Sequence, residues 1–173
     1  MYRGLKKIEL TVMRRGFDYW GAFDLTQDHE FIVRQGERND LYVVTPEVKY
    51  NVIGHEPEAE MAGLYIGNLT KKALNLSIEG AYLVAKASDK KKIKVTGQAE
   101  SLVLYGRDVF GSSITWAEES IRQNEKVIIA NKFGEALALG RARFDQDLLF
   151  EDKITVNTEA DMGLYIRGQD EYH

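Results

Sequence analysis

Short apolar runs separated by glycine turns dominate the last third of the chain. Two runs, Val127–Ala130 and Ala136–Leu139, flank a turn at residues 131–134, and a further run covers Ile154–Val156. Apolar runs of strand length joined by a short glycine-containing turn are typical of a β-hairpin. Evenly spaced short strands of this kind predict a small barrel in the second half of the chain.

The first half mixes the two periodicities. Ile8, Leu10 and Val12 alternate as in a strand, but residues 5–13 also fit the spacing of a helix. Thr45 followed by Pro46 predicts a helix start, because threonine caps helices and proline suits the first helical position. The remaining expectations are strands at 19–25, 30–34, 41–44 and 71–78, a strand or turn at 61–69, and a short helix or strand at 80–85.

A polar segment separates the two halves. Six of the nine residues in Lys86–Lys94 are Lys or Asp, which predicts a solvated connector. We therefore expect an α+β protein of two domains, residues 1–91 and residues 92–173.

Composition excludes several classes of protein. The 173 residues include no cysteine, which excludes disulfides, thiolate zinc sites and a cysteine nucleophile. The charged first residues do not resemble a signal peptide, and no apolar run approaches the roughly 20 residues needed to span a bilayer. We expect a cytoplasmic protein without a membrane partner.

No pattern of catalytic residues is present. The three histidines lie far apart at positions 29, 55 and 173, without metal-ligand spacing. Pairs of acids lie in polar runs that lack an apolar wall to shift a pKa. The glycines near residues 134 and 140 do not match a phosphate loop. We expect no catalytic residue, no metal, no cofactor and no enzymatic activity.

Basic residues are the candidate binding groups, although the net charge is −4. Arg141 and Arg143 lie two apart, so on an extended strand they would share a face. If the basic residues of the second half converge, they form a stripe suited to RNA phosphates. Tyr105 and Tyr165 could stack on bases, but their apolar neighbours favour a place in the core. The predicted RNA-binding residues are Arg107, Lys126, Lys132, Arg141, Arg143, Lys153 and Arg167.

The second half resembles a PUA domain, a small RNA-binding β-barrel. The resemblance rests on the hairpin, on the Leu104–Phe110 corner and on the closing segment Asp161–Arg167. When the comparison is extended toward the N-terminus, over residues 63–107, the chain is similar to the short archaeal form of the Nip-seven family. Members of that family assist large ribosomal subunit biogenesis. This resemblance implies an N-terminal α/β domain of antiparallel strands flanked by helices, followed by a PUA-type small β-barrel. It also favours a helix over a strand for the ambiguous segment at residues 5–13.

The resemblance also implies a function. It implies a non-enzymatic assembly factor in pre-rRNA processing that binds uridine- or AU-rich RNA, with ribosome-assembly or exosome proteins as partners. The alternative is an RNA-binding PUA subunit accessory to a tRNA-modifying enzyme of the transglycosylase type, which the hairpin also fits. The loop at residues 144–152 is acidic where the family carries basic residues. That departure leaves open a protein-interaction adaptor with weak RNA affinity.

Overall fold

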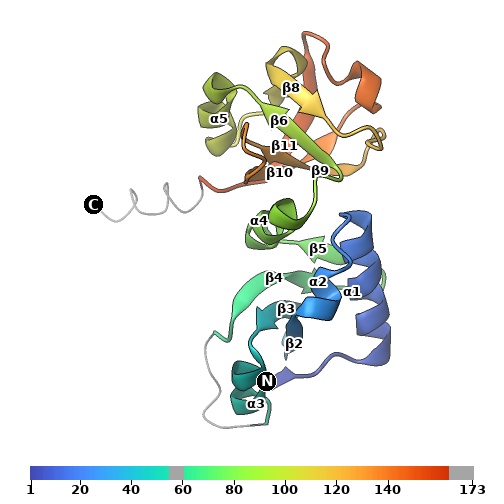
Figure 1. The fold of residues 1–173 in the computed structure, drawn as a ribbon, viewed down its shortest axis with the longest axis vertical. Helices are drawn as coiled ribbons and strands as arrows, with labels where there is room; N and C mark the ends of the chain where they lie inside the picture. Colours follow the sequence, from blue (N-terminus) through green and yellow to red (C-terminus); the bar gives the residue numbers. More distant parts are fainter. Residues whose placement is uncertain (55–60, 164–173) are drawn as a thin grey trace, which may run out of the picture. The chain divides into compact units, whose positions relative to one another are not determined.

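The computed structural model describes residues 1–54 and 61–163. The chain divides into two compact units, Met1–Ala87 and Ser88–His173, each with its own sheet (Figure 1). The predicted boundary, between residues 91 and 92, lies shortly after this division. No helix in the described ranges is long and apolar enough to cross a membrane.

The N-terminal unit is an antiparallel sheet with helices, as expected. Its five strands follow the order β1-β2-β3-β4-β5. The strands are β1 (Tyr2–Arg3), β2 (Glu30–Gln35), β3 (Asn39–Val44), β4 (Leu64–Leu69) and β5 (Leu74–Leu76); the helices are α1 (Lys7–Tyr19), α2 (Leu25–Asp28), α3 (Pro46–Val52) and α4 (Ile78–Ala87).

The ambiguous first segment is a helix. Helix α1 buries Val12, Met13 and Phe17, which share one helical face. The predicted strand at residues 19–25 is wrong, because α1 runs to Tyr19 and α2 begins at Leu25. Gly21 follows α1 with a φ of 69°, a left-handed conformation that ends a helix and that glycine adopts at little cost.

Helix α3 begins where the sequence predicts. The Thr45 hydroxyl accepts a hydrogen bond from the Val48 backbone N–H at 3.3 Å, and Pro46 occupies the first turn. The cap satisfies an amide that has no partner within the helix.

Replacing Thr45 with alanine is expected to lower the free energy of unfolding by about 1 kcal/mol, because the cap is lost. Hydrogen exchange at the Val48 amide should accelerate in this variant. Thr45→Ser keeps the hydroxyl and serves as the control. Equal exchange rates in the two variants would show that the hydroxyl does not stabilise α3.

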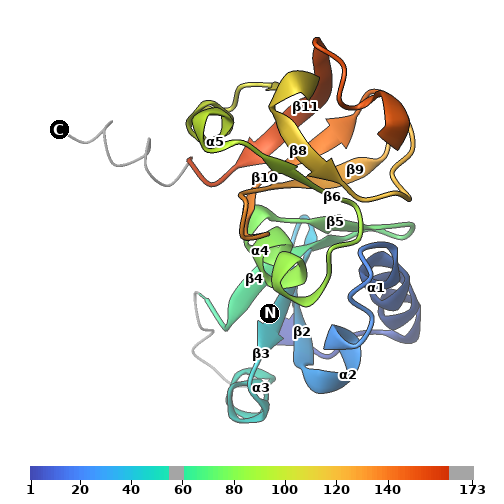
Figure 2. The same ribbon diagram turned by 45° about the horizontal axis from the view of Figure 1, so that its top comes forward.

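The C-terminal unit is the predicted PUA-type barrel. Its six-stranded sheet has the order β7-β11-β10-β9-β6-β8 (Figure 2). All neighbouring strands are antiparallel except β6 and β9, which are parallel. Its elements are β6 (Lys92–Val95), α5 (Gly97–Leu104), β7 (Val109–Phe110), η1 (Gly111–Ser113), β8 (Ile114–Ala117), β9 (Lys126–Ala130), β10 (Ala136–Ala142), η2 (Gln146–Leu148) and β11 (Ile154–Asp161).

The predicted solvated connector is wrong for two of its lysines. Lys91 and Lys92 are only 6% and 1% exposed. Lys92 Nζ lies 2.7 Å from a carboxylate oxygen of Asp89, and Lys91 Nζ lies 2.6 Å from Glu125. Because each ammonium has a carboxylate partner, the desolvation penalty of burial is offset. Composition indicates charge, but it does not reveal such partners.

Candidate nucleic-acid interface

Two exposed aromatic rings, each beside a lysine, lie at one end of the C-terminal sheet. Trp116 of β8 is 38% exposed, and Phe133, in the turn between β9 and β10, is 75% exposed. Lys94 Nζ lies 5.2 Å from the Trp116 ring centroid, and Lys132 Nζ lies 5.0 Å from that of Phe133. We call these four residues the aromatic–lysine patch.

Strand β6 makes the patch continuous. Lys94 is paired in register with Trp116 on β8 and with Ala130 on β9. Ala130 is the last residue before the turn that carries Lys132 and Phe133. A Cβ placed on Gly134 would lie 3.8 Å from Cε of Lys94, so the lysine stem reaches the turn. The two ring–lysine pairs are therefore neighbours, although they come from distant parts of the sequence.

The turn is held in one conformation by Asn131. Its side-chain oxygen accepts hydrogen bonds from the backbone N–H groups of Phe133 and Glu135, both at 3.0 Å. Gly134 donates to the Asn131 carbonyl at 2.9 Å and has a φ of 84°. A polar side chain that binds the following amides is a common device for fixing a tight turn. The Phe133 ring is thus presented to solvent from an ordered loop.

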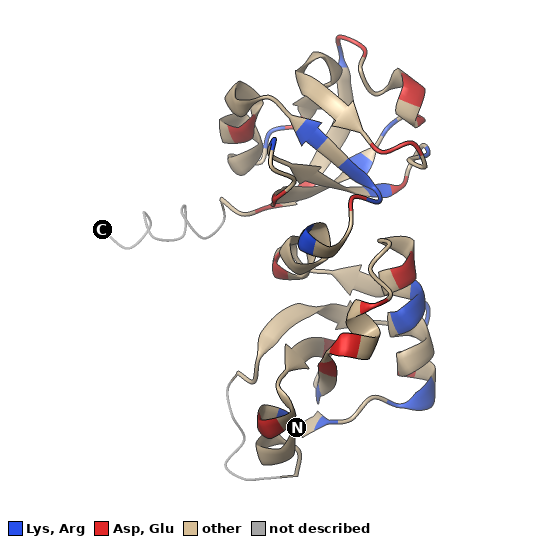
Figure 3. Cartoon of the chain, viewed as in Figure 1, with Lys and Arg blue, Asp and Glu red and all other residues tan. Residues whose placement is uncertain are grey.

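A buried ion pair, Lys92 with Asp89, lies next to the patch. The buried Lys92 lies under the turn, since a Cβ on Gly134 would be 3.3 Å from its Nζ. The hydrogen bond from Lys92 lowers the pKa of Asp89; burial opposes this, and the charges of Lys92 and Lys94 add to it. In the part of the chain that the structure describes, neither Lys94 nor Lys132 forms an ion pair. Figure 3 shows the blue lysine positions along β6.

The structure does not bring the six predicted basic residues that it describes into one stripe. Lys132 belongs to the patch. Lys126 and Arg141 are paired in register near the end of the hairpin that lies away from the turn. Arg141 comes five residues after Ala136, the first residue of β10, which corresponds to about 17 Å along the strand. Arg107 is exposed at the corner after α5, and Arg167 lies outside the described residues.

Two of the predicted residues have carboxylate partners. Arg141 Nε lies 2.7 Å from Glu159, and Lys153 Nζ lies 2.6 Å from Glu151. The exposed Arg143 follows the end of β10 at Ala142, so the two arginines do not both lie within the strand as predicted. Because each cation lies next to a carboxylate, Arg141 and Lys153 attract a phosphate less strongly than unpaired cations would.

Three residues do not stand out in the sequence pattern: the exposed Trp116, the half-buried Lys94 and the exposed Tyr105. Trp116 and Lys94 were not singled out, because their pairing depends on the register of β6 and β8. Tyr105 was expected in the core, and that expectation is wrong. It is the C-cap residue of α5, and its side chain is 70% exposed. Its neighbour Leu102 is also exposed, so this end of α5 is an apolar surface. Tyr165 lies outside the described residues.

The acidic loop at residues 144–152 is partly structural. Leu149 is fully buried in the core, and the Asp145 carboxylate accepts a hydrogen bond from the Gln123 N–H at 2.8 Å. Leu148 and Phe150, in contrast, are 42% and 41% exposed. The loop therefore contributes Leu149 to the barrel core, packs Phe144 against that core, and leaves two apolar side chains at the surface.

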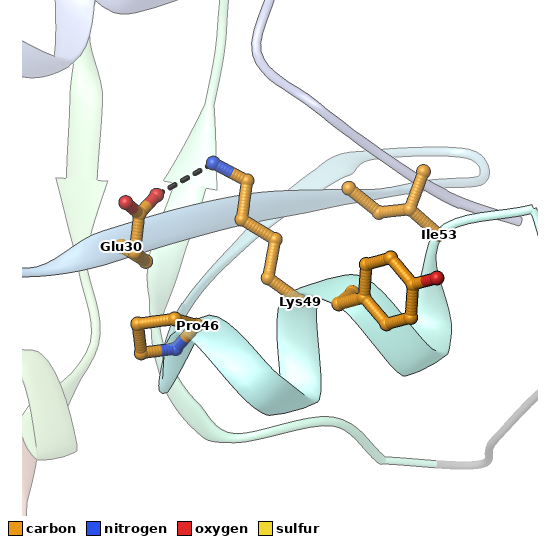
Figure 4. A pocket seen from close by; sticks show the side chains of 5 residues that line it. Glu30, Pro46, Lys49 and Ile53 are labelled. Carbon is orange, nitrogen blue, oxygen red and sulfur yellow. Dashed lines mark hydrogen bonds and ion pairs between the residues drawn. The ribbon is translucent and has the colours of Figure 1, made fainter.

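A hollow in the N-terminal unit does not offer a comparable site. Glu30, Pro46, Lys49, Tyr50 and Ile53 line it. Figure 4 shows the Lys49 ammonium turned toward Glu30, whose carboxylate lies 2.5 Å away. That cation is already neutralised. Among residues 1–54 and 61–163, no cluster of His, Cys, Asp or Glu could hold a metal ion.

Comparison with known proteins identifies relatives over the whole chain. Residues 91–170 match the family described as UPF0113 PUA domain. A UPF0113 protein of Archaeoglobus fulgidus is 35% identical over 167 residues, which cover 95% of this chain and 93% of the relative. The tRNA-guanine(15) transglycosylase of Pyrococcus abyssi is 34% identical over 71 residues, 40% of this chain and 12% of that enzyme.

Solved structures support the same fold. A conserved PUA domain protein from Thermoplasma acidophilum aligns over 97% of this chain and 99% of its own, with a TM-score of 0.66 and 18% identity. A hypothetical protein from Pyrococcus horikoshii also gives a TM-score of 0.66, at 14% identity over 93% of this chain and 94% of its own. The two-unit architecture is thus shared with proteins of archaea.

Proposed function

Because the chain belongs to the UPF0113 family and its second unit is that family's PUA domain, we propose that it is a non-catalytic RNA-binding protein. More specifically, we propose an assembly factor for the large ribosomal subunit that acts in pre-rRNA processing in the cytoplasm. The resemblance to the Nip-seven family supports this role. Its partners would be a uridine- or AU-rich segment of precursor rRNA and proteins of ribosome assembly or of the exosome.

The aromatic–lysine patch carries the proposal of RNA binding. Exposed rings stack on bases of any sequence, and lysines beside them attract the phosphates between those bases. Each lysine of the patch lies within cation–π distance of its ring, so a small rearrangement can move the ammonium to a phosphate. The net charge of −4 does not oppose this, because binding depends on local charge.

Removing the two lysine charges of the patch is expected to reduce the salt dependence of binding. In Lys94→Gln/Lys132→Gln, two phosphate contacts disappear, so the slope of log K against log salt should fall by about 1.4 for single-stranded RNA. Fluorescence anisotropy with a uridine-rich strand at several salt concentrations measures this slope.

The control is Arg141→Gln/Lys153→Gln. It removes the same formal charge from the same unit, but from side chains that already form ion pairs with Glu159 and Glu151. Its salt slope should stay close to that of the wild type. A larger change in the control than in the patch variant would place the phosphate contacts on the opposite end of the hairpin.

A second candidate function is that of an accessory subunit of a tRNA-modifying enzyme. The local similarity to the tRNA-guanine(15) transglycosylase favours it. Tighter binding of tRNA than of the uridine-rich strand, together with stimulation of such an enzyme, would support this function over ribosome assembly. Absence of RNA binding even at low salt would instead favour a protein adaptor, for which the exposed Leu148 and Phe150 are the candidate contacts.

A further inference from the structure

The turn between β4 and β5 presents two lysines in a fixed conformation. The Thr70 N–H donates to the Ala73 carbonyl at 2.9 Å. The Thr70 hydroxyl accepts from the N–H groups of Lys72 and Ala73, at 3.2 and 3.0 Å. Lys71 and Lys72 are both exposed. Because the turn is closed by its own hydrogen bonds, a ligand would not have to order it.

Helix α1 adds an arginine at this turn. A guanidinium nitrogen of Arg15 donates to the Lys72 backbone carbonyl. The helix also approaches β5 closely, since a Cβ on Gly16 would lie 2.7 Å from Cβ of Leu74. Glycine therefore lets the helix pack close enough for Arg15 to reach the turn. The Arg15 guanidinium therefore lies at the backbone of the turn that carries the two lysines.

Helix α1 carries two more exposed basic residues. Lys7 and Arg14 lie seven residues apart and share the side of the helix opposite Gly16, about 10 Å from each other. Among the described residues, neither these side chains nor those at the turn form an ion pair. Asp18 limits the surface at the end of α1. We call Arg15, Lys71 and Lys72, the basic residues that meet at the turn, the α1–turn surface.

We propose that the α1–turn surface is a second RNA-binding surface, which contacts the phosphate backbone and does not select bases. It lies outside residues 91–170, the part of the chain that matches the PUA family. Arginine can grip a phosphate through two N–H groups, and lysine supplies a mobile point charge. The backbone that carries these side chains is fixed by the helix and the turn, so binding has to order only the side chains. This inference rests on the proposal that the chain binds RNA.

The test uses the full chain with Lys71→Gln/Lys72→Gln. Both side chains are exposed, and Arg15 binds the carbonyl of Lys72 and not its side chain, so the turn should persist. Binding of a uridine-rich and of an adenine-rich strand should weaken by the same factor, on the order of tenfold at 0.1 M salt. The matched control, Arg38→Gln/Lys49→Gln, removes equal charge from the same unit and should leave binding nearly unchanged.

A second measurement locates the contact. Amide NMR signals of residues 71–73 should shift on titration with RNA, also in the Lys94→Gln/Lys132→Gln background. Unchanged affinity of Lys71→Gln/Lys72→Gln, with shifts confined to the C-terminal unit, would overturn the second surface while leaving the proposed function intact. No RNA binding by the wild type would overturn both. Equal shifts with poly-glutamate at the same ionic strength would assign the surface to acidic protein and overturn the inference.

Discussion

Replacing both rings of the aromatic–lysine patch, in Trp116→Ala/Phe133→Ala, is expected to weaken binding of uridine-rich RNA by roughly a hundredfold. Each base that stacks on an aromatic side chain contributes about 1–3 kcal/mol, and two stacked bases would be lost. Because stacking does not depend on counterion release, the loss should persist at high salt. Anisotropy at low and high salt separates this effect from that of the two lysines.

The control for this variant is Phe150→Ala. Phe150 is an exposed aromatic residue of the same unit, but it lies in the acidic loop, which offers little attraction for phosphate. Its affinity for RNA should match that of the wild type. Retained affinity in Trp116→Ala/Phe133→Ala, with a folded barrel by circular dichroism, would show that RNA stacks elsewhere; the exposed Tyr105 would then be the next ring to replace.

Replacing Glu9 with alanine is expected to lower the free energy of unfolding by about 3 kcal/mol. Two guanidinium nitrogens of Arg3 donate to the two Glu9 carboxylate oxygens, each at 2.7 Å, and the Lys6 N–H donates at 2.8 Å. Glu9 itself is only 7% exposed. Without the carboxylate, the partly buried Arg3 guanidinium loses its counter-ion, and the first turn of α1 loses a hydrogen-bond acceptor. Urea unfolding measures the change.

This contribution should depend on pH in a defined direction. The hydrogen bond from Arg3 lowers the pKa of Glu9 below the ordinary 4.5, and burial only partly opposes it. A carboxyl whose pKa is lower in the folded state stabilises the fold fully above its unfolded pKa, and this stabilisation is lost as the pH falls through the folded pKa. The difference in stability between wild type and Glu9→Gln should therefore shrink below about pH 4.5. A difference that grows in acid would contradict this assignment.

Local patterns were enough to predict the elements that depend on neighbouring residues. The β9–β10 hairpin follows from two apolar runs around a glycine turn, and the start of α3 follows from Thr45 and Pro46. Residues 5–13 fitted both periodicities, and the resemblance favoured the helix that the structure shows. The predicted strand at 19–25 failed because Trp20 and Ala22 are buried without belonging to any strand.

The candidate site was less predictable, because it depends on pairing between distant segments. Lys94 lies beside Trp116 and the hairpin turn only because β6 pairs with both β8 and β9. Arg141 looked available in the sequence, but Glu159, on the adjacent strand, pairs with it. A charge pattern gives the number of basic residues in a segment. It does not give the acids that lie across a sheet from them.

The parallel pairing of β6 and β9 has a consequence for synthesis of the chain. In the N-terminal unit, each strand from β2 to β5 pairs with the strand next to it in the sequence, so that sheet can grow as the chain leaves the ribosome. In the C-terminal unit, β6 lies between β8 and β9, and β9 ends at Ala130. The inner strand β6 of this sheet cannot pair until β8 and β9 have been synthesised, and contacts of long sequence separation form slowly. The nascent protein is therefore expected to hold a folded first unit while its RNA-binding barrel is still incomplete.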